Sequence, residues 1–295
     1  MKANLYYGKK DIRYEEMEIP EITSEEILIK MEACGLCGTD IQKILEGTAK
    51  APVVLGHEVV GKVIKTGKNV NKFSVGDRII TAIHVPCFTC NYCNKGHYTM
   101  CDQFRKTNIE PGGFAEYIKI PEPHVKHLVH KISDNISNEE AALAEPIACC
   151  IHGLKAADIQ ANDTVMIMGA GQIGIIHAQL ASLKGASKVI ITDISDFKLN
   201  KAKELGVQYT INVLNENLQE KINAITNNEG IDIMRLLHNY QNITKNLLII
   251  YLLTCFHLNF TKLLVLVSFS PVFLTFSLLG TLQIKGLALK PLSLY

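Results

Sequence analysis

Four cysteines within fifteen consecutive residues constrain this chain more than any other feature of its sequence. They are Cys87, Cys90, Cys93 and Cys101, spaced C-x2-C-x2-C-x7-C. Four thiolates in one loop can surround a tetrahedral zinc ion at Zn–S distances of about 2.3 Å. Because four sulfurs complete the coordination shell, no position remains for water or substrate. The spacing therefore predicts a structural zinc site, and any chemistry is expected elsewhere.

Two other interpretations of the cysteine cluster compete with zinc. Disulfide bonds suit a secreted protein, but the chain has nine cysteines and shows no signal-peptide pattern at its start. An iron–sulfur cluster also takes four cysteines, but the C-x3-C-P run of the bacterial ferredoxins does not follow here. We therefore expect structural zinc and a reducing, cytoplasmic location.

A second set of metal ligands is scattered along the sequence. Cys37 lies in the segment Cys34–Asp40, His57 and Glu58 are adjacent, and Glu145 lies between Ala144 and Pro146. One cysteine, one histidine and one or two carboxylates would leave a zinc ion with an open position for substrate. No single fragment is specific, since a lone cysteine is more often a small core residue. Their order alongside the four-cysteine loop is what favours a catalytic zinc.

A glycine motif in the second half of the chain predicts a dinucleotide site. Residues 163–168 form a short apolar run that predicts a buried strand. Gly169-Ala-Gly171-Gln172-Ile173-Gly174 follows at once, and a helix is expected over 175–184, ended by Gly185. The glycines permit a tight turn and close approach of the backbone to a pyrophosphate at the helix N-terminus.

A carboxylate at the end of the next strand favours NAD over NADP. Residues 188–192 predict a second strand, and Asp193 follows it, 19 residues after Gly174. This is close to the spacing expected for a carboxylate that binds the ribose 2′-hydroxyl, and it would repel a 2′-phosphate. Lys198 lies nearby and could tolerate phosphate, although a solvated helix charge is the more common role for such a lysine.

Taken together, these pieces resemble the zinc-dependent medium-chain dehydrogenases of the alcohol dehydrogenase superfamily, in the branch of sorbitol (L-iditol) and threonine dehydrogenases. The matching segments are Cys-Gly-Thr-Asp at 37–40, Pro-Val-Val-Leu-Gly-His-Glu at 52–58, Val-Gly-Asp-Arg-Ile at 75–79, the four-cysteine loop, Gly-Gly-Phe-Ala-Glu-Tyr at 112–117 and Ala-Glu-Pro-Ile-Ala at 144–148. The resemblance covers about residues 1–232. It implies an α/β fold with a catalytic zinc and a nicotinamide cofactor, and transfer of hydride from a secondary alcohol or polyol to NAD, giving a ketone.

For the catalytic zinc, the resemblance implies ligation by Cys37 and His57. Either Glu58 or Glu145 would complete the shell, and the sequence does not decide between them. With the four-cysteine loop, we expect two zinc ions per chain. The substrate could also be threonine or a simple secondary alcohol.

The resemblance also implies a route for the alcohol proton. Thr39 stands where the family places a relaying hydroxyl, and Gln42 stands where the family often has a histidine. Because an amide cannot titrate, the outer part of this relay would have to run through water. Cys149 and Cys150 follow Pro146 on an apolar helix, and we expect both in the core rather than on a metal.

Two domains are expected before the character of the chain changes. Residues 1–134 show short strands with turn signals, typical of a β-rich, barrel-like domain. The resemblance implies that this is the GroES-like catalytic domain. Residues 135–232 alternate helix and strand, typical of the first half of a doubly wound Rossmann domain. The expected strands are 27–33, 58–65, 78–83 and 114–120 in the first domain and 163–168, 188–192 and 207–212 in the second, with a helix over 216–227. The net charge of +1 and pI near 7.6 give no indication of a nucleic-acid partner. The resemblance also brings in a homo-oligomer of the family type, which the altered character of residues 233–295 puts in question.

The last part of the chain loses this pattern. Residues 233–295 contain no Asp or Glu, and no Gly occurs between Gly230 and Gly280. Three interpretations compete: a disrupted reading frame, a membrane anchor over 263–284, which is 22 residues without a charge, or divergent strands such as 247–253 and 263–269. The first interpretation would leave three strands of the cofactor sheet without a fourth partner, and the chain would be a catalytically inactive zinc-binding remnant.

Overall fold

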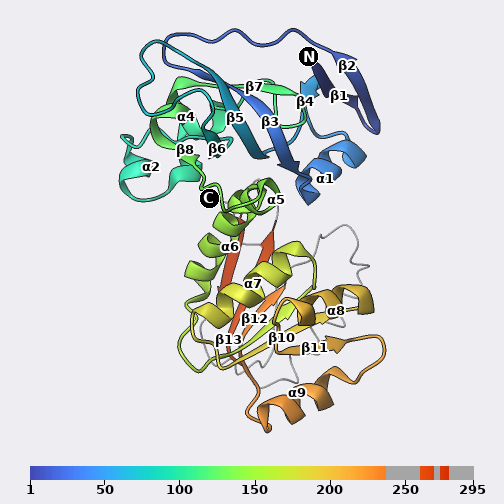
Figure 1. The fold of residues 1–295 in the computed structure, drawn as a ribbon. Helices are drawn as coiled ribbons and strands as arrows, with labels where there is room; N and C mark the ends of the chain where they lie inside the picture. Colours follow the sequence, from blue (N-terminus) through green and yellow to red (C-terminus); the bar gives the residue numbers. More distant parts are fainter. Residues whose placement is uncertain (237–259, 269–272, 279–295) are drawn as a thin grey trace, which may run out of the picture. The chain divides into compact units, whose positions relative to one another are not determined.

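The chain forms two units, Met1–Cys149 and Cys150–Tyr295, in a computed structural model (Figure 1). The structure describes residues 1–236, 260–268 and 273–278. Each unit is built around its own sheet or sheets. The expected α/β class, an antiparallel GroES-like domain together with a parallel Rossmann-type sheet, is confirmed.

The first unit contains two antiparallel sheets. One has five strands in the order β7-β3-β5-β6-β8, and the other has three in the order β2-β1-β4. The strands are β1 (Lys2–Gly8), β2 (Asp11–Glu16), β3 (Ile27–Gly35), β4 (Val53–Val54), β5 (Glu58–Thr66), β6 (Arg78–Thr81), β7 (Tyr117–Ile120) and β8 (Val129–Lys131). Alternate residues of β3, β5 and β7 point into one apolar core with Phe73 and Val125. The sequence predicted four of these strands, but β6 ends two residues before the expected 83 and β7 begins three residues after 114.

Short helices surround the sheets of the first unit. They are α1 (Gly38–Glu46), α2 (Asn91–Asn94), the 3-10 turn η1 (Tyr98–Met100), α3 (Asp102–Lys106), α4 (Glu122–His127) and α5 (Asn138–Ala142). The longer helix α6 (Ala144–Ala157) continues from the first unit into the second. Helices α2, η1 and α3 lie in the loop that carries the four cysteines.

The second unit is a six-stranded sheet in the order β11-β10-β9-β12-β13-β14. Its strands are β9 (Thr164–Met168), β10 (Lys188–Asp193), β11 (Tyr209–Asn212), β12 (Ile231–Leu236), β13 (Phe260–Ser268) and β14 (Phe273–Leu278), and its helices are α7 (Gln172–Leu183), α8 (Asp196–Glu204) and α9 (Leu218–Thr226). The pairs from β11 to β13 are parallel, and β13 pairs with β14 antiparallel.

Both faces of this sheet are covered, and every residue of its strand β9 is buried. Val165 and Ile167 pack in one core with residues of α7 and α8 (Figure 1). Met166 and Met168, which point the other way because side chains alternate along a strand, pack in a second core with Ile222 of α9. This arrangement holds the glycine motif at the carboxyl end of β9.

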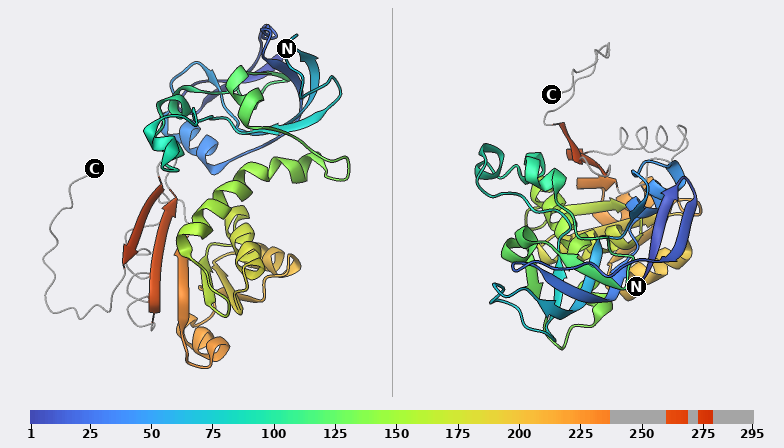
Figure 2. Two further views of the ribbon diagram at one scale, coloured as in Figure 1. Left: turned by 90° about the vertical axis from the view of Figure 1, so that its left-hand side faces the viewer. Right: turned by 90° about the horizontal axis from the view of Figure 1, so that it is seen from above.

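The expectation of a sheet without a fourth strand is wrong. Strand β12 lies beside β9, with Ile233 opposite Val165 and Leu236 opposite Met168. Figure 2 shows β13 and β14, drawn in red, continuing the sheet beyond β12. The loss of acidic residues and glycines after residue 232 did not predict the end of the sheet, because a strand buried on both faces needs neither residue type.

The structure tests the three interpretations of residues 233–295 only where it describes this region, at residues 233–236, 260–268 and 273–278. Strand β13 covers most of the expected strand at 263–269, whereas the expected strand at 247–253 lies outside the described residues. The described portions of the proposed membrane segment are strands. No helix within the described ranges is both long and apolar enough to cross a membrane.

Candidate functional site

The four cysteines of the loop converge on one point. Their sulfur atoms all lie within 4.8 Å of one another. Cys93 Sγ is 3.5 Å from Cys90 Sγ and 3.9 Å from Cys87 Sγ. The edge of a tetrahedron with bonds of about 2.3 Å is about 3.8 Å, whereas disulfide sulfurs are about 2.05 Å apart. The geometry therefore fits one zinc ion, and every cysteine that the structure describes is free of disulfides.

The electrostatics of this cluster favour a bound cation. Burial, followed by the neighbouring thiols, raises the pKa of Cys93 to about 12. A hydrogen bond from Thr89 and backbone N–H groups lower the pKa of Cys87 to about 5. Thiols this close cannot all ionise beside one another unless a metal offsets their charge. The donor set is thus suited to a closed, structural site.

A second cluster brings together Cys37, His57 and Glu58, whose ligand atoms also lie within 4.8 Å of one another. Cys37 is the N-cap of α1, and its sulfur accepts a hydrogen bond from the backbone N–H of Thr39 at 3.5 Å. Glu58 is the first residue of β5, and His57 directly precedes it. Sulfur, imidazole and carboxylate are all zinc ligands, and three of them leave a fourth position open.

The carboxylate of Glu58 fits only because its neighbour is a glycine. Gly35 of β3 lies opposite Glu58 of β5 in the ladder. A Cβ atom on Gly35 would lie 1.8 Å from Oε2 of Glu58. Burial, followed by the charge of Glu145, raises the pKa of Glu58, and a bound cation would offset both effects.

The sequence interpretation missed the role of Asp40. This fully buried carboxylate lies 3.3 Å from Nδ1 of His57 and accepts backbone hydrogen bonds from Cys37 at 3.2 Å and Gly56 at 3.3 Å. It therefore orients two metal ligands at once, as carboxylates behind metal-bound histidines commonly do. The signal was present in the sequence, because Cys37 and Asp40 have the spacing of a helix capping box.

The contacts of His57 and Asp40 decide the protonation of both side chains. Burial lowers the pKa of His57, but its hydrogen bonds to Asp40 and Cys37 outweigh burial and raise the pKa to about 10. Burial opposes ionisation of Asp40, but the hydrogen bond and charge of His57, together with the backbone hydrogen bonds from Cys37 and Gly56, outweigh burial, so the pKa of Asp40 lies below its ordinary value. Binding of a metal would release a proton from this set.

Glu145 lies near the second cluster but outside it. Its charge contributes to the raised pKa of Glu58, yet it is absent from the group of three ligand atoms. Its Oε1 accepts a hydrogen bond from Cys149 Sγ at 3.2 Å. Of the two carboxylates that the sequence left open, the structure groups Glu58 with Cys37 and His57.

The two residues of the expected proton relay both lie on α1. Thr39 is half-buried and lies two residues past the N-cap residue Cys37. Gln42 donates a hydrogen bond from Nε2 to Oε2 of Glu46 at 3.1 Å. The amide is therefore tied to a carboxylate further along the helix.

In the second unit, the glycine motif forms the turn between β9 and α7. Gly169 has φ +108°, which favours glycine, and a Cβ on Gly174 would lie 1.8 Å from the carbonyl oxygen of Gly169. A Cβ on Gly171 would meet no atom within 4 Å, so the turn is open on that side. Gln172 and Ile173 begin α7 and are exposed. Their backbone N–H groups have no partner within the helix and suit an anionic pyrophosphate.

Asp193, at the end of the neighbouring strand β10, binds the backbone of the glycine turn. Its Oδ2 accepts a hydrogen bond from the backbone N–H of Ala170 at 2.8 Å, and its Oδ1 accepts from Ile194 and Ser195 at 2.8 and 2.9 Å. Nζ of Lys198 lies 3.9 Å from Oδ2. The carboxylate is thus fixed at the carboxyl end of β10, beside the glycine turn.

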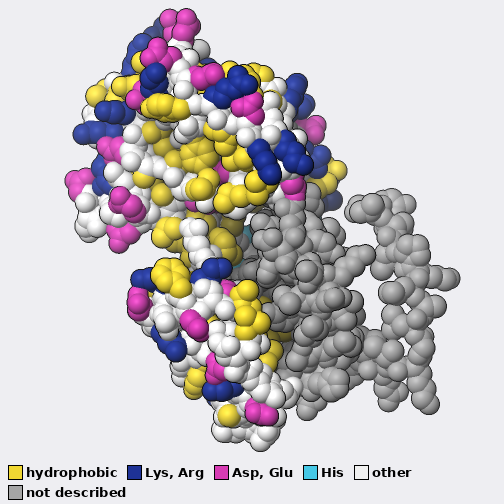
Figure 3. All heavy atoms as spheres, turned by 90° about the vertical axis from the view of Figure 1, so that its right-hand side faces the viewer, with side chains coloured by type: hydrophobic (Ala, Val, Ile, Leu, Met, Phe, Trp, Pro, Cys, Tyr) yellow, Lys and Arg dark blue, Asp and Glu magenta, His cyan; other side chains and the backbone are white. Residues whose placement is uncertain are grey.

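An apolar hollow of the first unit lies away from both clusters. It has a volume of about 430 Å³ and is lined by side chains of β1, β2 and α1, including Ile12, Ile41 and Leu45, together with Leu36 of the segment between β3 and α1. Figure 3 shows apolar side chains gathered on this face. Its lining includes no cysteine, histidine or carboxylate.

Comparison with known proteins agrees with this geometry. Residues 23–134 match the model of the alcohol dehydrogenase GroES-like domain, and residues 173–235 match that of the zinc-binding dehydrogenases. Sorbitol dehydrogenase of Bacillus subtilis (strain 168) is 35% identical over 240 residues, which cover 79% of this chain and 67% of that protein. L-threonine 3-dehydrogenase of Alteromonas mediterranea is 36% identical, covering 77% of this chain and 67% of that protein. The chain belongs to the zinc-containing medium-chain alcohol dehydrogenase family, among its sorbitol and threonine dehydrogenase-like members.

Solved structures show the same architecture. A zinc-binding dehydrogenase of Sinorhizobium meliloti 1021 bound to NADP superposes with a TM-score of 0.70 at 32% identity, covering 80% of this chain and 69% of that chain. The present chain spans about two thirds of the length of the curated relatives that it matches.

Proposed function

We propose that this chain is a zinc-dependent oxidoreductase that transfers hydride from a secondary alcohol or polyol to NAD. The single observation that carries the proposal is the mixed cluster of Cys37, His57 and Glu58, supported by the buried Asp40. Its three ligands suit an ion with an open position, whereas the four cysteines of the loop suit a closed one. We propose one zinc ion at each cluster.

A zinc ion at the open cluster would supply Lewis acidity to the hydroxyl group of the substrate. Cys37, His57 and Glu58 would hold the ion, and Asp40 would keep the imidazole and the start of α1 in place. Thr39, two residues past Cys37, would accept the proton of the alcohol. Because Gln42 is bonded to Glu46, that proton would pass on through water.

The glycine turn and Asp193 would bind the adenine half of the cofactor. The N–H groups at the start of α7 would hold the pyrophosphate, with Gly169, Gly171 and Gly174 allowing its approach. Asp193 would accept hydrogen bonds from the ribose hydroxyls. Its negative charge favours NAD over NADP, and Lys198 reduces that preference because a cation tolerates phosphate.

A polyol is the substrate class that we favour. Relatives named sorbitol dehydrogenase and L-threonine 3-dehydrogenase are both among the matches, and sorbitol is a polyol. The cluster itself would accept either, so the choice depends on side chains around it. L-threonine is therefore the second candidate substrate.

Activity of the full chain tests this proposal. Zinc-loaded protein should reduce NAD in the presence of sorbitol or another polyol, and Cys37→Ser should abolish that activity while leaving the four-cysteine site loaded. Measured rates on polyols, simple secondary alcohols and L-threonine would rank the substrate classes. Folded protein that carries zinc at both clusters and oxidises none of them would overturn the proposal.

Cofactor choice is tested separately. Asp193→Asn keeps an acceptor for the backbone N–H groups but removes the charge, so it should narrow the preference for NAD over NADP by about tenfold, which corresponds to about 1.4 kcal/mol. Tighter binding of NADP than NAD by the unmodified protein would contradict the role assigned to Asp193.

A further inference from the structure

Four strands of the five-stranded sheet bring basic side chains into one row. Lys30 of β3 lies opposite Lys62 of β5, and Lys62 lies opposite Arg78 of β6. On its other side, Lys30 lies opposite Tyr117 of β7. Residues directly opposite each other on neighbouring strands project from the same face of a sheet, with Cβ atoms about 5 Å apart. The four residues therefore form an unbroken row on one face, which we call the basic row.

The basic row lies on the face of the sheet that is turned away from the apolar core of the first unit. The neighbouring residues Ile29, Ile79 and Ile118 are fully buried in that core. Because side chains alternate along a strand, residues 30, 78 and 117 project from the opposite face. Lys30 and Lys62 are both exposed there. The strands thus hold two ammonium groups side by side on a rigid surface.

Two of the three cations in the basic row have no acidic partner. Arg78 is engaged, because its Nε lies 3.7 Å from Oε2 of Glu32 and its Nη2 donates a hydrogen bond to Asn138 at 2.6 Å. Lys30 and Lys62 take part in no ion pair within the described ranges, and the residues outside those ranges include no Asp or Glu. Like charges directly opposite each other destabilise a pair of strands. An anion bound between the two lysines would remove this repulsion.

We propose that Lys30 and Lys62 form a binding site for a phosphate group, with the hydroxyl of Tyr117 as a further donor. Among the residues that the structure describes, this hydroxyl makes no hydrogen bond to the protein. A phosphate monoester carries about −1.5 to −2 charges at pH 7 and three acceptor oxygens, which match two ammonium groups and one hydroxyl. Because the two free charges lie on adjacent strands, the site suits one compact dianion, either inorganic phosphate or a small monoester. It depends neither on the metal clusters nor on the proposed function.

Thermal unfolding of the zinc-loaded full chain tests this site. Inorganic phosphate should raise the Tm by about 2–4 °C relative to sodium chloride of equal ionic strength, as expected for a ligand at about ten times its Kd. Lys30→Gln and Lys62→Gln should each remove most of that shift. Lys50→Gln changes an exposed lysine outside the row and should retain it. Glycerol 3-phosphate is the second probe, and calorimetric titration of both probes shows which source of phosphate binds more tightly.

Reversing one charge gives a prediction of opposite sign. In Lys30→Glu, a carboxylate opposite Lys62 replaces repulsion by attraction. This variant should have a higher Tm than the unmodified protein in the absence of phosphate, and phosphate should no longer raise it. Tyr117→Phe should weaken phosphate binding by about tenfold, the usual effect of losing a hydrogen bond to a charged group.

The variants also separate the basic row from the other place that could take phosphate, the glycine turn at the start of α7. A Tm shift that persists in both Lys30→Gln and Lys62→Gln would place the phosphate elsewhere and overturn the proposal. The absence of a shift with either probe in the unmodified protein would overturn it as well. A shift lost equally in Lys50→Gln would show a general effect of net charge, which is the third outcome that contradicts a site at the row.

Discussion

The two metal-ligand clusters of the first unit differ in how the chain assembles them. All four cysteines of the closed cluster come from residues 87–101, and backbone N–H groups of the same loop bond to their sulfurs. The open cluster joins Cys37 to His57 and Glu58 across two strands and a helix. The closed cluster thus depends mainly on its own loop, and the open cluster depends on the surrounding fold.

The clusters also differ in what supports their ligands. In the open cluster, one buried carboxylate, Asp40, contacts two of the three ligands, and the third needs the absence of a side chain at Gly35. No comparable buried carboxylate contacts a sulfur of the closed cluster in the described part of the chain. We expect the closed cluster to govern stability and the open cluster to govern activity.

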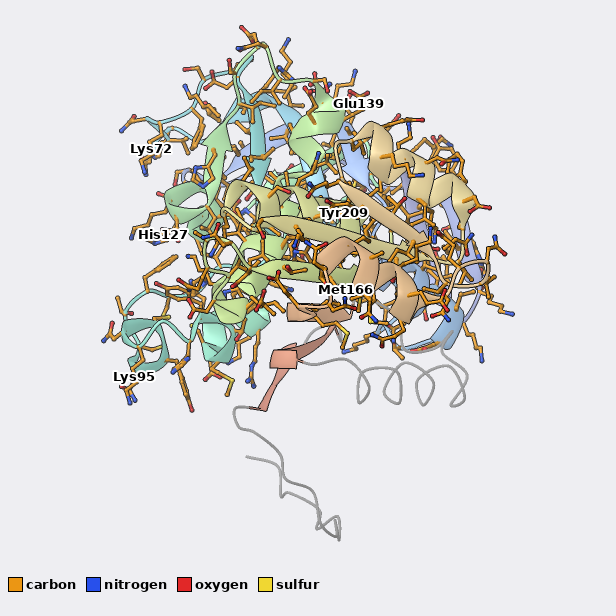
Figure 4. The ribbon with its side chains drawn as sticks, turned by 90° about the horizontal axis from the view of Figure 1, so that it is seen from below. Lys72, Lys95, His127, Glu139, Met166 and Tyr209 are labelled. Carbon is orange, nitrogen blue, oxygen red and sulfur yellow. The ribbon has the colours of Figure 1, made fainter. Side chains whose placement is uncertain are left out.

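The largest expected effect is loss of a sulfur from the closed cluster. Cys93→Ser should remove one zinc ion per chain and lower the Tm by about 10 °C or more, because zinc binding to structural sites contributes about 10–16 kcal/mol in small zinc peptides. Elemental analysis and thermal unfolding measure both. Lys95→Ala, an exposed change in the same loop (Figure 4), is the control and should leave both unchanged. If Cys93→Ser keeps two zinc ions per chain and an unaltered Tm, the closed cluster does not govern stability and the proposed difference between the clusters is wrong.

Loss of a sulfur from the open cluster should have the opposite profile. Cys37→Ser should reduce the zinc content from two ions to one and lower NAD-linked turnover by at least about 100-fold, while Tm changes by no more than about 3 °C. The reason is that the remaining zinc still stabilises the loop. A fall in Tm as large as that of Cys93→Ser would show that both sites are structural.

Changing Asp40, which orients two ligands of the open cluster, should have a smaller effect than removing a ligand. Asp40→Asn keeps the shape of the side chain but removes the charge facing His57, and should weaken zinc binding at that site by about 10–100-fold. Competition with a chelator measures this. Asp102→Asn, an exposed residue next to Cys101, is the matched change beside the closed cluster and should have no effect. Equal zinc affinity in Asp40→Asn and the unmodified protein would rule out the assigned role.

The smallest contrast uses glycines. Gly35→Ala places a methyl group against Glu58, so it should cost about 1–3 kcal/mol of stability and weaken zinc binding at the open cluster. Gly96 has φ +78° and open space around it, so Gly96→Ala should cost about 1–2 kcal/mol through backbone strain alone and leave zinc binding intact. Both variants are dialysed against zinc before their zinc content is measured, so that a low content reflects weak binding rather than loss during purification. If Gly96→Ala loses zinc and Gly35→Ala does not, the steric argument at Glu58 is wrong.

The same contrast explains what the sequence could predict. The cysteine loop and the glycine turn are local, so their spacing alone predicted where four sulfurs and one helix N-terminus would lie. The third member of the open cluster was not predictable, because choosing Glu58 over Glu145 depends on how β3 and β5 pair. Asp40 was missed because its role arises from contacts with a helix start and a strand start that are 17 residues apart, at 40 and 57. Strand β12 was missed because a strand buried on both faces lacks the alternating polar residues by which a strand is recognised in a sequence.

The locality of the cysteine loop has a consequence for the order of events during synthesis. Once residue 101 has left the ribosome, every sulfur of the closed cluster is available, and capturing zinc requires closing only a short loop. The open cluster must wait until β3 and β5 have paired, and its neighbour Glu145 emerges more than forty residues after Cys101. A nascent chain would therefore capture its structural metal while the catalytic ligands are still unarranged, and the finished loop would be in place before the site that uses the second ion.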